Sequence, residues 1–123
     1  MRWPSAWLTA SSCALLLAAC GGGGGASLPG DYAPGAAAQA DRIGRLVDAH
    51  RECAASSLAV RLQARTIDAI NGRRIPPPLQ EELLGRVNLL VASIPCGEMD
   101  RGGDDPAELA RALAGWLRDH AAS

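Results

Sequence analysis

The residues best suited to chemistry in the main part of the chain are His50, Cys53, Cys96 and His120. His50 and Cys53 lie three positions apart, which places both side chains on one face of a predicted helix. Two cysteines and two histidines form a ligand set that zinc accepts in a tetrahedral site. Zinc motifs usually contain two cysteines close in sequence, whereas these two are far apart. A disulfide bond is the alternative, and the compartment of the protein decides between the two.

The start of the chain has the features of an export signal. Residues 1–19 begin with a weak positive charge at Arg2 and continue through a stretch rich in leucine and alanine. This stretch is shorter than the roughly 20 apolar residues that a membrane-spanning helix needs, and it has the length of a signal-peptide core. We therefore expect residues 1–19 to be a signal peptide.

A lipid-attachment motif closes this leader. Leu17, Ala18, Ala19 and Cys20 resemble the lipobox of bacterial lipoproteins. The resemblance covers only the leader and implies that Cys20 becomes the first residue of the mature chain and is diacylated, with fatty acids such as palmitate. Two acyl chains attach a protein stably to a membrane, because each buried CH2 contributes about 0.8 kcal/mol. The expected location is extracytoplasmic, with a lipid anchor in the bacterial cell membrane.

Residues 20–39 are predicted to be a flexible tether. Five glycines follow Cys20, and the rest of the segment is mostly Gly, Ala, Pro and Ser, with Asp31 as its one charged residue. Such a composition offers little bulk that could be buried. Residues 40–123 are then predicted to form one small domain that stands off the membrane.

Helical periodicity dominates this domain, and no segment alternates like a strand. The third segment has the clearest apolar stripe, which Pro95 ends. The fourth begins with an N-cap signal at Asp105, followed by Pro106. We expect an all-α fold, a small bundle of about four short helices. The helices are predicted at residues 40–55, from Ser56-Ser57 to Ile70, at 78–94 and from Asp105 onward. One long, bent helix in place of the first two is the alternative.

A domain of about 80 residues usually needs stabilisation beyond its core. Cys53 and Cys96 form an even pair once Cys13 leaves with the leader and Cys20 is acylated. An oxidising compartment favours a disulfide between them. Closing a loop of about 43 residues destabilises the unfolded chain by about 4 kcal/mol in the chain-entropy model. We expect this disulfide to join the end of the first helix to the end of the third.

Charge and aromatic content argue against a nucleic-acid partner. The formal net charge is -1, and every basic residue is arginine. A nucleic-acid-binding domain would carry a clustered positive charge. Without the leader, Trp116 and Tyr32 are the remaining aromatic residues, which is too few for stacking on bases or sugars. No cofactor is expected.

No catalytic set is recognisable in the sequence. It contains no Cys-x-x-Cys and no convincing Ser-His-Asp spacing, and the acids after Gly97 do not match an EF-hand. Glu81 and Glu82 fall in the first turn of a predicted helix, where the helix dipole favours acids. We therefore expect a non-enzymatic interaction module. The alternative is a small-molecule or metal site at the corner of His50, Cys53 and Cys96.

The predicted contact zone lies beside three consecutive prolines. Arg73, Arg74 and Ile75 precede them, and the loop from Gly97 to Asp104 is a second candidate. The stretch from Gly72 to Cys96 is similar to small exported proteins of actinobacteria that carry no assigned activity. This similarity implies a bacterial setting outside the cytoplasm. The expected partners are the membrane, through Cys20, and another protein of the cell envelope.

Overall fold

The computed structural model describes residues 25–97 and 104–122. Within them the chain is all-α, as predicted, with no β-strand. The predicted signal peptide, the lipobox-like motif and Cys20 lie outside the described residues, as do residues 98–103 of the predicted loop. The described helices are α2 (Ala33–Asp48), α3 (Glu52–Asn71), α4 (Pro77–Ser93) and α5 (Pro106–Asp119).

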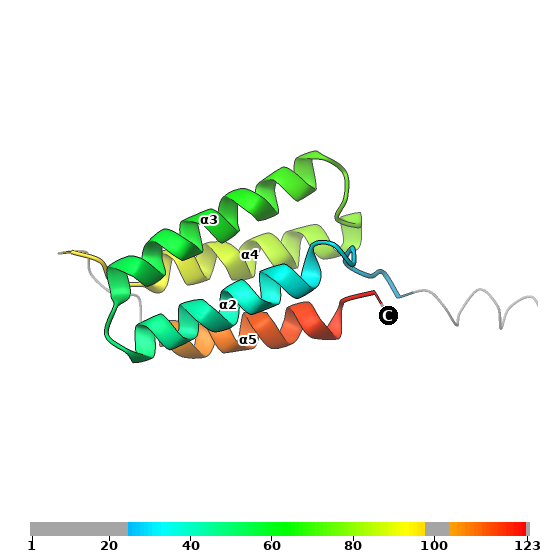
Figure 1. The fold of residues 1–123 in the computed structure, drawn as a ribbon. Coiled ribbons are helices and arrows are strands. Elements are labelled where there is room, and N and C mark those ends of the chain that lie inside the picture. The colour runs from blue at the N-terminus through cyan, green and yellow to red at the C-terminus, as the bar shows by residue number, and fades with distance from the viewer. Residues whose placement is uncertain (1–24, 98–103, 123) are drawn as a thin grey trace, which may run out of the picture.

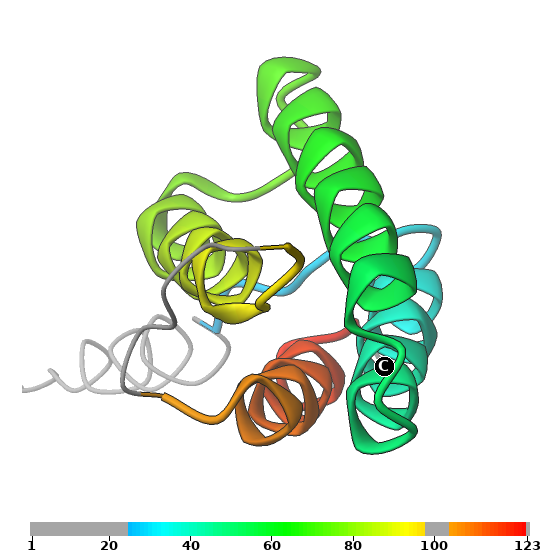
Figure 2. The same cartoon turned by 90° about the vertical axis from the view of Figure 1, so that its left-hand side faces the viewer.

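The helices run alternately up and down and surround one core, as the end-on view in Figure 2 shows. α2 packs against α3 and α5, and α4 packs against the same two helices from the other side. The α2–α5 interface is the most extensive. Gly44 of α2 lies against Ala107 and Ala110 of α5, which shows that the two backbones approach closely there. The small residues that the two helices bury are Ala33, Ala36, Ala37, Ala40, Gly44, Ala107, Ala110 and Ala114.

The bundle has two distinct ends (Figure 1). At one end, which we call the Leu28 end, the backbone of Leu28 donates to the carbonyl of His120 and accepts from the N–H of Ala122. The turn between α3 and α4 lies at this end too. The opposite end, which we call the disulfide end, contains the α2–α3 turn, the bond between Cys53 and Cys96, and the start of α5.

The predicted tether is wrong from Leu28 onward. Leu28 is fully buried, Tyr32 is 1% exposed, and α2 begins at Ala33 instead of residue 40. Alanine is the strongest helix former, and Pro34 is acceptable in a first helical turn. The small residues of this segment therefore build a helix that packs closely, although they offer little bulk to bury.

The break between the first two helices also differs from the prediction. Ser56 and Ser57 lie inside α3, and the chain turns at residues 49–51 instead. There His50 adopts a left-handed conformation with φ 58°. Its N–H donates to the carbonyl of Val47, and the next N–H, of Arg51, donates to that of Leu46. This is a Schellman motif, which normally uses glycine at the left-handed position.

The last two helices follow their sequence signals closely. Residues of the predicted α4 stripe, from Leu79 to Leu90, are buried. The carboxylate of Asp105 accepts a hydrogen bond from the N–H of Ala107 at 3.0 Å, so the predicted N-cap of α5 is confirmed. Leu113 and Trp116 turn inward toward the core.

Candidate functional site

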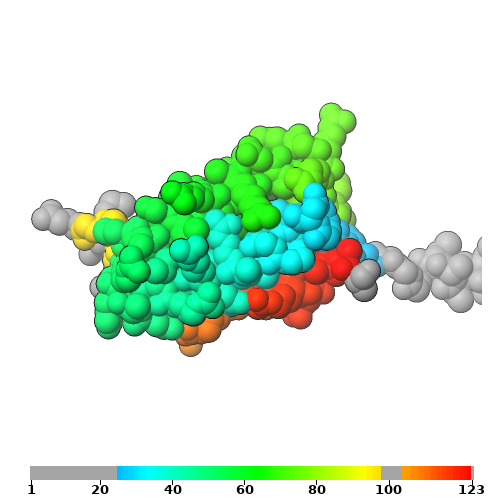
Figure 3. Space-filling model, viewed as in Figure 1, coloured from blue at the N-terminus to red at the C-terminus, as the bar shows by residue number. Residues whose placement is uncertain are grey.

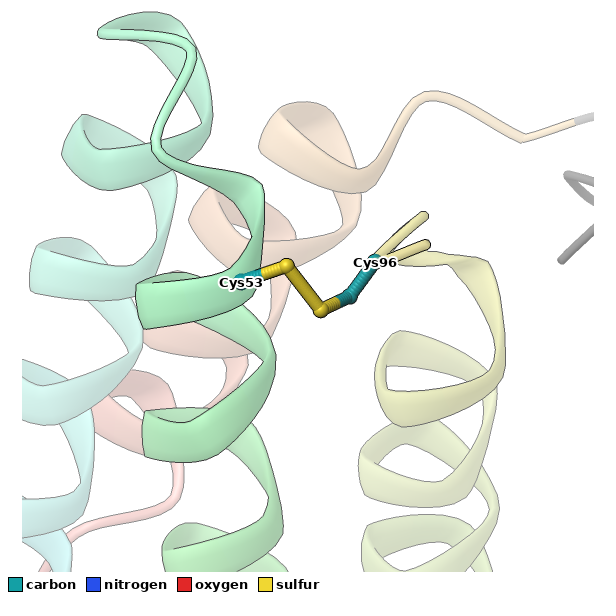
Figure 4. Close-up of a disulfide and its surroundings, with 2 residues drawn as sticks. All are labelled: Cys53 and Cys96. Carbon is teal, nitrogen blue, oxygen red and sulfur yellow. A yellow bond between two sulfur atoms is a disulfide. The ribbon is translucent and has the colours of Figure 1, made fainter. Parts of the chain in front are cut away.

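The disulfide is the clearest feature of the disulfide end (Figure 4). Cys53 lies in the first turn of α3, and Cys96 lies just beyond α4, with 4.7 Å between their Cα atoms. The predicted pairing is therefore confirmed. Its position relative to the helices is not as predicted, because Cys53 lies at the start of α3, the second of the four described helices, and not at the end of the first. The bond fastens the start of α3 to the segment that leaves α4.

Beside the disulfide, the α2–α3 turn exposes His50. The side chain of His50 is 90% exposed, and its Nδ1 lies 3.7 Å from Oε1 of Glu52. The left-handed turn directs this imidazole away from the core. The ring of His50 is therefore in contact with solvent and is not packed beside the disulfide.

A cleft of about 320 Å³ opens next to this turn. Its carboxylates already have structural partners. Asp48 accepts from Arg111 of α5 at 2.9 Å, Glu52 lies beside His50, and Asp105 caps α5. The cleft is lined by Val47, Asp48, His50, Glu52, Pro95, Asp105 and Pro106.

The structure does not assemble the alternative zinc site. His120 lies at the Leu28 end, where its ring stacks on Trp116 with 4.2 Å between ring centroids, and His50 lies at the opposite end. Both cysteine sulfurs are joined in the disulfide, so neither is a thiolate ligand. Within residues 25–97 and 104–122, no group of three or more His, Cys, Asp or Glu side chains is arranged to hold a metal ion.

The predicted contact zone of Arg73, Arg74 and Ile75 is also revised. Ile75 is 1% exposed and belongs to the core. Arg74 donates to the carboxylate of Asp31, and this hydrogen bond lowers the pKa of Asp31. Arg73 is exposed and occupies the left-handed position of the α3 end, with φ 60°. Of the three side chains, one is buried and one is paired, so they do not form a continuous docking surface.

A second concave surface, which the sequence did not reveal, lies between α2 and α3. This basic groove has a volume of about 260 Å³ and is lined by Arg42, Leu46, Arg51, Ala54, Ser57, Leu58 and Arg61. The positions of the arginines in the sequence do not predict this groove, because the position of the turn between α2 and α3 determines whether their side chains come together. With the break predicted at residues 56–57, Arg51 belongs to the middle of a helix and not to the turn.

The structure thus has three surface features: the disulfide end, an acidic cleft whose carboxylates already have partners, and the basic groove. No family model, curated protein or solved structure matches this chain. In the described part of the chain, none of the helices has the length and apolar character needed to cross a bilayer. What the protein does is therefore inferred from these surfaces and from the sequence of residues 1–20.

Proposed function

We propose that this chain is a lipid-anchored protein of the bacterial cell envelope. Its helical domain would be a non-enzymatic interaction module held outside the cytoplasm. The lipobox-like Leu17-Ala18-Ala19-Cys20 supports the anchor. The Cys53–Cys96 disulfide is consistent with an oxidising compartment, since such bonds are rare in the cytosol.

The observation that carries the proposal is the way the chain enters the domain. Leu28 is fixed by backbone hydrogen bonds at the end opposite the disulfide. The seven residues 21–27 separate it from Cys20. Eight peptide steps span at most about 29 Å, so an anchored Cys20 would keep the Leu28 end near the membrane.

The same geometry would direct the disulfide end outward. The 20 residues of α3 extend for about 30 Å along the bundle. With the Leu28 end restrained by the lipid, partner proteins would meet the disulfide end and the helix faces next to it. A disulfide at that end would keep the exposed surface folded where no chaperone of the cytoplasm acts.

The anchor is tested by growing cells on a fatty-acid analogue that can be tagged. The wild-type protein should carry the tag and sediment with membranes, and Cys20→Ser should remove both properties. Cys13→Ser is the matched control and should change neither, because that residue leaves with the leader. An untagged wild-type protein that retains residues 1–19 would overturn the proposal.

The interaction role is tested by photo-crosslinking in living cells. A photoreactive residue at exposed Ala49, at the disulfide end, should capture a defined envelope protein. The same residue at exposed Arg73, at the Leu28 end, should capture little of it. Equal capture from both positions, or none from either, contradicts an outward-facing disulfide end.

A further inference from the structure

The described part of the chain contains ten arginines, in three groups. Four of them, Arg74, Arg86, Arg111 and Arg118, form salt bridges with carboxylates. Arg45, Arg65 and Arg73 lie outside the groove lining and form no salt bridge within the described residues. The three arginines of the basic groove, Arg42, Arg51 and Arg61, also have no such partner within residues 25–97 and 104–122. Their guanidinium groups therefore have hydrogen-bonding capacity that this part of the chain does not use.

The unequal distribution follows from the faces of α2. Asp41 and Asp48 lie seven residues apart on the side of α2 that faces α5. There they pair with Arg118 and Arg111 of that helix. The face turned toward α3 carries Arg42 and Leu46 instead. The carboxylates of α2 thus form ion pairs at the interface with α5, and the positively charged side chains lie at the interface with α3.

The groove combines this charge with an apolar floor. Leu46 and Leu58 are half-buried between the two helices, with Ala54 beside them. No carboxylate belongs to the groove lining among the described residues, in contrast to the cleft on the other side of the α2–α3 turn. At about 260 Å³ the groove is smaller than the roughly 300–1,000 Å³ of typical small-molecule pockets. It suits a few side chains of a peptide.

We propose that the basic groove binds an acidic segment of a partner protein in which carboxylates flank an apolar side chain. This inference rests on the proposed function and supplies the chemistry of the partner. Guanidinium groups bind carboxylates through paired, charge-assisted hydrogen bonds, which gives the contact geometric specificity. The apolar side chain of the segment would cover Leu46 and Leu58, which water now reaches.

The position of the groove favours a protein over a lipid headgroup. Arg42 lies nine residues beyond the start of α2, about 14 Å from the Leu28 end, and Arg51 lies farther still. The groove thus occupies the half of the α2–α3 face nearer the disulfide end, and Figure 3 views the molecule from this side. An anchor at Cys20 would approach the opposite end.

The test measures binding of two fluorescent peptides by anisotropy. One peptide contains Asp and Glu around leucines, and the other has Asn and Gln in place of those acids. The protein is the chain from residue 20 onward with Cys20→Ser. The acidic peptide should bind, the amide peptide should bind at least tenfold more weakly, and binding should weaken as salt is raised.

The decisive comparison uses two double variants with the same change in charge. Arg42→Gln with Arg61→Gln should weaken binding of the acidic peptide at least tenfold. Arg73→Gln with Arg86→Gln, which alter arginines outside the groove lining, should change it less than twofold. Similar losses in both variants, or no binding by the wild type, overturn the proposal. Arg42, Arg61 and Arg73 are exposed, whereas Arg86 is half-buried with its guanidinium over the ring of Trp116. Circular dichroism and thermal denaturation check that both variants keep the helical fold.

A third experiment distinguishes a protein partner from a lipid surface. Vesicles with three parts neutral and one part anionic phospholipid are offered to the same proteins. Binding to vesicles that requires Arg42 and Arg61, without binding to the acidic peptide, replaces the protein partner with a lipid surface. Fatty-acid tagging at Cys20 is independent of all these results. Failure of the groove and failure of the proposed anchor are therefore distinguishable.

Discussion

The phenol oxygen of Tyr32 lies 2.8 Å from the hydroxyl oxygen of Thr66 inside the bundle. Thr66 donates its own hydrogen to the carbonyl of Leu62, so Tyr32 is the donor of the bond between the two side chains. The bond links the start of α2 to the middle of α3 and satisfies two polar groups that are withdrawn from water. The same ring lies beneath the guanidinium of Arg65. Tyr32 thus fixes the segment that composition alone assigns to a tether.

Replacing Tyr32 with phenylalanine should lower the free energy of unfolding by about 1 kcal/mol, because one buried hydrogen bond is lost without a large cavity. Urea denaturation measures the change. Thr66→Val provides the other side of a double-mutant cycle, and the two changes should not be additive. Full additivity would show that the two hydroxyl groups do not act together.

The stability of the domain should fall as the pH rises above about 10. Burial raises the pKa of Tyr32 above its ordinary 10.0, and the hydrogen bond with Thr66 opposes this in part. The folded protein therefore keeps the phenol proton at a pH where the unfolded chain has released it, and unfolding becomes more favourable as the pH increases. Tyr32 is the single tyrosine of the chain, so tyrosinate absorbance reports its ionisation directly. Tyr32→Phe should show a flatter dependence over this range.

Replacing His50 with glycine should raise the free energy of unfolding by about 1 kcal/mol. A left-handed conformation costs a non-glycine residue about 1–2 kcal/mol, and glycine removes this strain from the folded state. Glycine also gives the unfolded chain more conformational freedom, which offsets about 0.5–1 kcal/mol of the stabilisation. His50→Ala is the control, since alanine bears the same strain, and it should give no increase. Chemical denaturation of the three proteins measures the difference. Equal stability of the glycine and alanine variants would contradict the strained turn.

The sequence predicts the two C-terminal helices better than the two N-terminal ones for a physical reason. Around α4 and α5, prolines and an acidic N-cap act locally and fix where each helix begins. The α2–α3 turn has no such marker. His50 takes a conformation that its own side chain disfavours, and tertiary packing imposes it. Asn71-Gly72 correctly marks the end of α3, although the left-handed residue is Arg73 and not Gly72.

The sequence predicts the disulfide of the candidate site but not the basic groove. Once Cys13 is assigned to the predicted leader and Cys20 to the predicted lipid, Cys53 and Cys96 are the two cysteines that remain to be paired. That inference needs no knowledge of the turn. The basic groove requires Arg42 of one helix to face Arg61 of the next. That meeting depends on the three-residue turn at 49–51, which the sequence did not locate. Small residues before position 40 likewise carry no periodic signal, although they pack closely.

Removing the disulfide should destabilise the domain by about 4 kcal/mol, because the loop of 43 residues between Cys53 and Cys96 is then free in the unfolded chain. The double variant Cys53→Ala with Cys96→Ala measures this by thermal denaturation. The wild-type protein in reductant should unfold at the same lowered temperature, and the variant should not respond to reductant. A wild-type melting temperature that is insensitive to reductant would contradict the expected stabilisation.

Leu28→Ala decides whether the segment before α2 belongs to the domain. Leu28 is fully buried against the core and its backbone pairs with the last residues of the chain. Truncating a buried leucine to alanine costs about 2–5 kcal/mol, from lost transfer energy and the cavity left behind. Ser27→Ala is the matched control, because Ser27 is exposed and its truncation should change stability by less than about 0.5 kcal/mol. A flexible tether at this position would make the two variants equally stable, and the Leu28 end would then not be held near the proposed lipid anchor.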